Sequence, residues 1–278
     1  MAATVVDLTT EVKNFARSEG AALVGFAPVE RFKNAPKGHR PGDFISKAKS
    51  VIAFGMRISD AIVDYDGYPN QFTGAASWAT STAPRLGWAQ AVRSNIYLYM
   101  GHYIQDNLLS NLATKLAWRL EDMGFRSMPM PATTTPYAHT PELTWTQYFL
   151  PWSNRHAAVM AGLGEFGYNN IVLTPEYGPR IRFTSVITEA EFEYTPLLSK
   201  KVCLGEKCRK CLDACPTNAI QLKESIDPSQ VFIATPAKTD ARLCRIIDET
   251  TGAVSIGCFF YGTCLRVCPI KPKLRKRR

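Results

Sequence analysis

The sequence predicts a mixed α/β protein, of the α+β kind, in two parts. Apolar residues recur at alternating helical and strand spacings through about residue 198. All eight cysteines follow, between Cys203 and Cys268. The stretch before the first cysteine is long enough for a domain with its own core. We therefore expect one domain at residues 1–198 and a second at residues 199–278.

The first part opens with a helix followed by two strands. Residues 8–15 place apolar side chains at helical spacing, behind Asp7 or Thr9 as the candidate N-cap. Residues 22–27 and 50–56 are short apolar runs bounded by turn residues, which is typical of buried strands.

The longest helical pattern covers residues 88–123 and should pack on a sheet. A loop rich in proline and threonine follows at residues 129–142. We then expect a short helix at residues 155–160 and strands at residues 171–174 and 180–188. The side chains expected to share the buried face of the long helix are those of Ile96, Tyr97, Met100, Tyr103, Ile104, Leu108, Leu112, Leu116 and Leu120.

The cysteines form two runs that each end in Cys-Pro, which is typical of iron-sulfur proteins that transfer electrons. In two-cluster ferredoxins the cysteine before each proline ligates the other cluster. One 4Fe-4S cluster is therefore assigned to Cys203, Cys208, Cys211 and Cys268. The second is assigned to Cys215, Cys244, Cys258 and Cys264, which leaves no cysteine over.

Zinc and disulfides are the competing interpretations of these cysteines. Zinc sites bring their ligands in two short pairs and have no use for a third cysteine at this spacing or for the Cys-Pro endings. Disulfides need an oxidising compartment, and residues 1–23 are charged and lack the apolar segment of a secretory signal. The four residues between Cys203 and Cys208 are the main irregularity, since ferredoxins mostly have two.

Composition predicts a soluble, cytoplasmic protein. Hydrophobic residues make up 46% of the chain and charged residues 21%, and no apolar run approaches the length of a membrane span. The formal net charge is +9, but residues 271–278 supply six of these charges. A terminal charge run of this kind is typical of a solvated tail, with an anion or nucleic-acid site as the alternative.

A glycine-rich segment at residues 161–182 is the second informative feature. Gly162, Gly164 and Gly167 allow a backbone that lies close against a ligand, although a plain turn also explains them. Their spacing matches the letters of the dinucleotide fingerprint, but the segment follows a helix and precedes a strand. The dinucleotide interpretation therefore fails.

With these motifs the chain resembles the corrinoid-dependent reductive dehalogenases and the related epoxyqueuosine reductases. The resemblance rests on Ala-Gly-Leu-Gly-Glu at residues 161–165, Leu-Thr-Pro-Glu-Tyr-Gly-Pro-Arg at residues 173–180, and the cysteine runs. It implies a nitroreductase-like domain that holds cobalamin base-off, and a ferredoxin-like domain that passes electrons to the cobalt. The residues implied for cobalamin binding are Gly162, Gly164, Glu165, Gly167, Tyr168, Asn169, Thr174 and Gly178.

Within this resemblance the dehalogenase branch is favoured, as a minimal core. The stretch from Pro175 to Arg180 is similar to that branch, whereas Tyr168 stands where epoxyqueuosine reductases have lysine. No twin-arginine export signal is present, and none of the four histidines lies in an Asp-x-His-x-x-Gly motif, so no protein imidazole is expected on the cobalt.

The same resemblance implies a proton donor. Aligned on the epoxyqueuosine reductase pattern, Tyr148 takes the place of the catalytic acid and Arg155 that of the arginine seven residues later. A neighbouring cation would lower the pKa of a phenol from its usual value of about 10. Simple packing of aromatic residues 148–152 is the alternative, and Tyr103 and Tyr137 are rival donors.

The sequence thus predicts an oxidoreductase that takes electrons from a low-potential donor, such as ferredoxin or flavodoxin, and acts on a small molecule. Two other functions stay open. One is an epoxyqueuosine reductase-like enzyme acting on tRNA, with the basic tail as a phosphate contact, although nucleic acid is not favoured. The other is a non-catalytic electron carrier or activator that docks on a partner protein.

Overall fold

A computed structural model describes residues 4–64, 96–97, 99–132, 152–215, 217–223, 230–232, 235–240, 243–244 and 262–272. At its centre is a four-stranded sheet in the order β1-β2-β6-β3, in which all neighbouring strands are antiparallel. The strands are β1 (Leu23–Pro28), β2 (Ser50–Arg57), β6 (Ile181–Thr188) and β3 (Ser127–Met130). The predicted strands at 22–27, 50–56 and 180–188 thus lie side by side.

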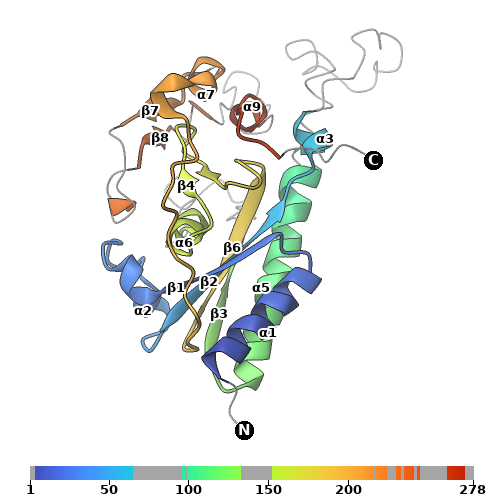
Figure 1. Ribbon diagram of the computed structural model, residues 1–278, viewed down its shortest axis with the longest axis vertical. Helices are drawn as coiled ribbons and strands as arrows, with labels where there is room; N and C mark the ends of the chain where they lie inside the picture. Colours follow the sequence, from blue (N-terminus) through green and yellow to red (C-terminus); the bar gives the residue numbers. More distant parts are fainter. Residues whose placement is uncertain are drawn as a thin grey trace, which may run out of the picture.

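Two helices cover one face of the sheet, α1 (Val5–Ser18) and α5 (Ile104–Asp122) (Figure 1). Helix α1 begins at Thr4, whose hydroxyl accepts a hydrogen bond from the Asp7 amide at 3.2 Å, while the Asp7 carboxylate accepts one from the Thr4 amide at 3.4 Å. The prediction of Asp7 or Thr9 as the N-cap was therefore wrong. Asp7 is the third helical residue of a capping box, three positions after the cap itself.

The opposite face carries α6 (Asn154–Met160), α2 (Pro41–Phe44) and the 3₁₀ helix η1 (Val29–Phe32) (Figure 1). Strand β2 serves both cores, since Val51 and Ala53 face α6 whereas Ile52 and Phe54 face α1 and α5. Side chains alternate between the faces of a strand, so a strand covered on both sides is a continuous apolar run. Residues 50–56 are apolar on both faces because each face lies in a core, and this continuous apolar run made the strand recognisable from the sequence.

The predicted buried face of the long helix is correct at Tyr97 and in its C-terminal half, but not between them. Leu112, Leu116 and Leu120 are buried, but Met100, Ile104 and Leu108 are 43–49% exposed. A residue advances about 100° around an α-helix, so apolar residues placed four apart rotate around the helix axis by about 40° from one to the next. Over several steps the stripe therefore winds from the sheet to the surface.

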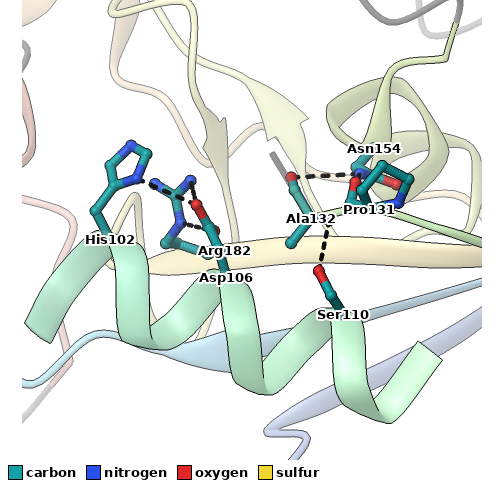
Figure 2. A network of polar contacts seen from close by, with 7 residues as sticks. All are labelled: His102, Asp106, Ser110, Pro131, Ala132, Asn154 and Arg182. Atoms are coloured by element: carbon teal, nitrogen blue, oxygen red, sulfur yellow. Dashed lines mark hydrogen bonds and ion pairs between the residues drawn. The ribbon is translucent and has the colours of Figure 1, made fainter. Parts of the chain in front are cut away.

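The sheet-facing positions at this end of α5 are polar instead. They lie in η3 (Tyr99–Tyr103), a π-helical turn that leads into α5, and in the first turn of α5 itself. Asp106 is buried and accepts hydrogen bonds from the Arg182 side chain of β6 at 2.6 and 2.9 Å, and the His102 ring nitrogen Nδ1 lies 3.1 Å from the same carboxylate (Figure 2). This cluster pairs the charges that α5 and β6 bury between them.

Strand β3 was not predicted, because Pro129 lies within it and the sequence there was assigned to a loop. Proline cannot donate to a neighbouring strand, so it is confined to sheet edges. β3 is such an edge, since it pairs with β6 alone. A prediction that ends every strand at a proline cannot identify an edge strand of this kind.

The cysteine-rich part packs on the first part rather than standing apart from it. Its elements are η5 (Gly205–Lys207), α7 (Lys210–Asp213), β7 (Ile220–Leu222), β8 (Ala237–Thr239) and α9 (Thr263–Arg266), grouped with the hairpin of β4 (Glu165–Phe166) and β5 (Val172–Leu173) at one end of the molecule (Figure 1). Leu265 of α9 joins a core with Ile58, Tyr97 and Val63, the last from α3 (Asp60–Val63). Val231 completes the core around α6.

These elements confirm the mixed α/β class. Across the part of the chain that the structure describes, no helix combines the length and apolar character needed to cross a membrane.

Candidate iron-sulfur and cofactor site

Four cysteines from separate places in the chain line one pocket. They are Cys203, Cys208, Cys211 and Cys268, the set assigned to the first cluster. Tyr168, Asn169 and Leu173 of the β4–β5 hairpin line the same pocket. The cysteine site is therefore built from both predicted domains.

Burial, and to a lesser degree the neighbouring thiols, raise the pKa of two cysteines in this pocket. Burial, followed by the charges of Cys203 and Cys268, raises the pKa of Cys211 to about 11. Burial also raises the pKa of Cys268, and Cys203 and Cys208 add to the effect. Thiolates gathered here would need positive charge beside them, which the irons of a cluster supply, so the residues fit a 4Fe-4S group.

Backbone conformation shapes the loop that carries these ligands. Arg209, between Cys208 and Cys211, has a left-handed φ of +50° and precedes α7. Such a residue reverses the chain and turns successive amides toward one side. Among the described residues no three His, Cys, Asp or Glu side chains converge on a single ion. A cubane is larger than one ion and takes its thiolates at separate corners.

The second set of cysteines is described only in part, because Cys258 lies outside the described residues. Cys215 is buried, and its sulfur accepts a hydrogen bond from the Ala219 amide at 3.3 Å. Burial raises the pKa of this thiol, but the amides of Thr217 and Ala219 outweigh it, so the pKa is lowered overall. Cys264 lies on α9 against the core of Ile58 and Tyr97. The Cys244 amide donates to the Asp240 carbonyl at 2.9 Å.

Glycine is required at several positions between residues 162 and 178 because other parts of the protein pack against the backbone there. A Cβ on Gly162, where φ is +71°, would overlap the carbonyl of Pro196, and one on Gly164 would lie 2.5 Å from the carbonyl of Leu173. Gly167 meets the Leu173 side chain in the same way. These contacts account for glycine without a ligand. Gly164→Val would therefore disrupt the hairpin itself, whether or not a cofactor is bound.

The other residues implied for cobalamin also contact the protein. Asn169 accepts from the Ile171 amide at 3.2 Å and Thr174 from the Tyr177 amide at 3.0 Å, so both side chains brace turns. Glu165 and Tyr168 bind the loop before η5, as described below. Their role in cobalamin binding stays a prediction.

Arg155 lies exposed on α6 and donates to the carbonyl of Asn170 at 2.6 Å, which ties α6 to the turn between β4 and β5. Tyr148 and Tyr137 lie outside the described residues. The third candidate, Tyr103, belongs to η3, with its ring 5.7 Å from that of Tyr99. The pairing of Tyr148 with Arg155 therefore stays a prediction.

Arg180, the last residue of the Pro-Glu-Tyr-Gly-Pro-Arg motif, is a site residue that the sequence reasoning missed. Its side chain is fully buried and donates to Asp60 at 2.9 Å and to Asp64 at 2.7 Å. Two residues earlier, Gly178 leaves no room for a Cβ against the carbonyl of Ile270, just past Cys268. Arg180 thus ties the motif to α3 and the residue that follows it, while Gly178 lets the motif lie against the end of the second cysteine run. In the sequence, the only indication of this ion-pair site was that Asp60 and Asp64 lie four residues apart.

A small aromatic cavity lies on the α6 side of the sheet. It has a volume of about 190 Å³, and Phe32, Trp152, Phe232 and His156 are among its lining residues. The imidazole of His156 stacks on Phe232 with ring centroids 4.7 Å apart. Burial, with the Arg155 charge beside it, lowers the pKa of His156 to about 4, so this ring is neutral at pH 7.

Comparison with known proteins agrees with this arrangement. Residues 204–271 match the model of the 4Fe-4S double cluster binding domain. The epoxyqueuosine reductase of Bacillus subtilis is 26% identical over 296 aligned positions, which cover 96% of this chain and 64% of that protein. The tetrachloroethene reductive dehalogenase of Desulfitobacterium hafniense is 46% identical over 66 residues, 23% of this chain and 12% of that protein.

Solved structures share the fold. A crystal structure of epoxyqueuosine reductase with an epoxyqueuosine-modified tRNA-Tyr stem loop superposes with a TM-score of 0.57 and 21% identity, over 98% of this chain and 68% of that chain. A reductive dehalogenase structure, described with a mechanism for B12-dependent dehalogenation, superposes with a TM-score of 0.60 and 17% identity, over 99% of this chain and 33% of that chain.

The matched domain and the cysteine site define a protein of the iron-sulfur class, and both groups of similar proteins are reductases. The chain is a relative of the epoxyqueuosine reductases and the reductive dehalogenases, and the resemblance inferred from the sequence is confirmed. It spans less than two thirds of the length of the Bacillus subtilis relative.

Proposed function

We propose that this protein is an iron-sulfur, cobalamin-dependent reductase that cleaves carbon-halogen bonds in a small molecule. The observation that carries the proposal is the pocket in which four thiols of the cysteine runs meet the β4–β5 hairpin. A cluster held there lies directly against the segment whose motifs resemble the dehalogenases. The B12-dependent chemistry named for the dehalogenase neighbour supports the choice of cofactor.

The chain's own residues have two tasks in this proposal. The two cysteine sets hold the clusters, which accept electrons singly from a low-potential donor such as ferredoxin or flavodoxin. Cobalamin, when bound, supplies a metal that can be reduced at low potential. Tyr148 holds the proton that the product needs, and Arg155 favours its release by stabilising the phenolate.

An anaerobic reconstitution tests the proposal. Protein purified without oxygen should contain about eight iron and eight sulfide per chain, and after loading and desalting it should retain cobalamin with a base-off absorption spectrum. Reduction of a halogenated phenol with release of halide then completes the assignment. Protein that carries iron but retains no cobalamin would instead be an electron carrier, and the proposal would be wrong.

The epoxyqueuosine reductase alternative has an observation of its own in its favour. The Bacillus subtilis relative matches 96% of this chain, whereas the dehalogenase match covers 23%. Activity on an epoxyqueuosine-containing stem loop, with binding that weakens steeply as salt rises, would establish it. Under the dehalogenase proposal the stem loop is neither reduced nor bound with such salt dependence.

A further inference from the structure

The loop that carries Cys203 is held by a carboxylate from the other part of the chain. One oxygen of Glu165, on β4, accepts hydrogen bonds from two successive amides, that of Val202 at 2.6 Å and that of Cys203 at 2.7 Å. Charge-assisted bonds to consecutive amides fix the backbone of the residues that donate them. The position of the Cys203 backbone is therefore set by the hairpin.

A second bond from the same hairpin closes on the other end of this loop. The Tyr168 hydroxyl donates to the Glu206 carboxylate at 3.0 Å, and the Tyr168 ring packs beside Gly205, whose φ is +58°. The loop of residues 202–206 is thus hydrogen-bonded at both ends to the β4–β5 hairpin. The loop lies between Cys203 and Cys208, where the spacing departs from that of most ferredoxins.

We propose that Glu165 is a positioning residue for the first cluster: it presents Cys203 as a ligand and keeps the potential of that cluster low. The family model begins at residue 204, so it does not include Cys203. With four residues between Cys203 and Cys208, an unsupported loop would place Cys203 in many conformations. The hydrogen bonds from the β4–β5 hairpin hold this loop in one conformation.

The carboxylate also acts on the electronics of the cluster. A negative charge close to a cluster disfavours the reduced, more negative state, and amides that are occupied by Glu165 are not free to donate to the sulfurs. Both effects lower the reduction potential. A low potential is what a donor to a low-potential acceptor requires.

This inference rests on the proposed clusters, and three variants test it. Glu165→Gln keeps the shape and the acceptor oxygen but removes the charge, Glu165→Ala removes both, and Glu176→Gln removes a charge from the exposed turn between β5 and β6 as the matched control. Each is purified anaerobically and measured for iron and sulfide, for electron paramagnetic resonance after reduction with dithionite, and for the midpoint potential of each cluster.

Three results are expected. Glu165→Ala should fall toward about four iron per chain, and mild oxidation should give the signal of a three-iron cluster as Cys203 is released. Glu165→Gln should keep its iron while the potential of one cluster moves to a more positive value. Glu176→Gln should match the unchanged protein in all three measurements.

The outcomes separate the two proposals. If Glu165→Ala does not fold, the potential of Glu165→Gln still decides the question. A Glu165→Gln protein with the iron content, spectrum and potentials of the unchanged protein overturns the role of Glu165. If the unchanged protein itself takes up no iron, the cluster proposal fails instead.

Discussion

At single positions, two glycines with a positive φ differ in what they are needed for. Gly178 and Gly124 both have a positive φ, +54° and +91°. At Gly124 no atom lies within 4 Å of where a Cβ would stand, whereas at Gly178 the Ile270 carbonyl already occupies that place. The backbone conformation is similar, so the two positions isolate the effect of the contact.

Alanine at these two positions should therefore have unequal costs. Gly124→Ala should lower the free energy of unfolding by roughly 1–2 kcal/mol, through the left-handed backbone conformation alone. Gly178→Ala also overpacks the segment after Cys268, which adds about 1–3 kcal/mol. Thermal midpoints at one scan rate, measured anaerobically, give the order, and equal midpoints for both variants would contradict the packing of this segment on residues 178–180.

Tyr148→Phe belongs to the same scale. Removing only the hydroxyl leaves the ring, so iron content and cobalamin loading should be unchanged while turnover of a halogenated substrate falls by roughly 100-fold or more. Tyr103→Phe is the control and should be nearly silent. Full activity of Tyr148→Phe would remove this residue from the mechanism.

Among the elements, α5 shows what hydrophobic spacing can and cannot predict. The pattern identified a helix, and the buried leucines toward its C-terminal end were named correctly. The pattern could not show that Asp106 at the other end of α5, together with His102 of the preceding η3, is buried, because that depends on Arg182 of a strand far along the chain. Local spacing reports a helix, but the partner of each face is a tertiary property.

Two leucines of α5 test this register. Leu116→Ala empties a buried site and should reduce the free energy of unfolding by about 2–5 kcal/mol. Leu108 is 48% exposed, so Leu108→Ala should change it by less than about 0.5 kcal/mol. Denaturant unfolding of both variants under identical anaerobic conditions measures the difference, and similar losses would show that the helix is rotated from the position described.

The site divides in the same way between local and distant information. Cysteine spacing alone predicted which four thiols share a pocket, because the ligand pattern of cluster proteins is written in short segments. Glu165 was assigned to cobalamin instead, since its contact with Cys203 spans 38 residues and leaves no mark in either segment. The buried Arg180 was missed for the same reason.

On the scale of the whole molecule, the two cysteine runs are predicted to exchange a ligand. Cys268 lies in the second run but lines the pocket of the first, while Cys215 belongs to the first run and is assigned to the second cluster. Cys211→Ser and Cys268→Ser should therefore lose the same cluster and leave the same spectrum, with about four iron each. Cys215→Ser should leave the other spectrum. A Cys268→Ser protein whose spectrum matches that of Cys215→Ser would mean that each run keeps its own cysteines.

The distance in sequence between Cys211 and Cys268 has a consequence for biosynthesis. A ribosome has already released the sheet, the β4–β5 hairpin and three of the four thiols of the first pocket before Cys268 is made. Iron delivered early would find an incomplete set of ligands. A cluster in this pocket can therefore be completed only after Cys268 has been made, on a sheet and hairpin that have already left the ribosome, and any delay in its insertion leaves the thiols open to oxidation.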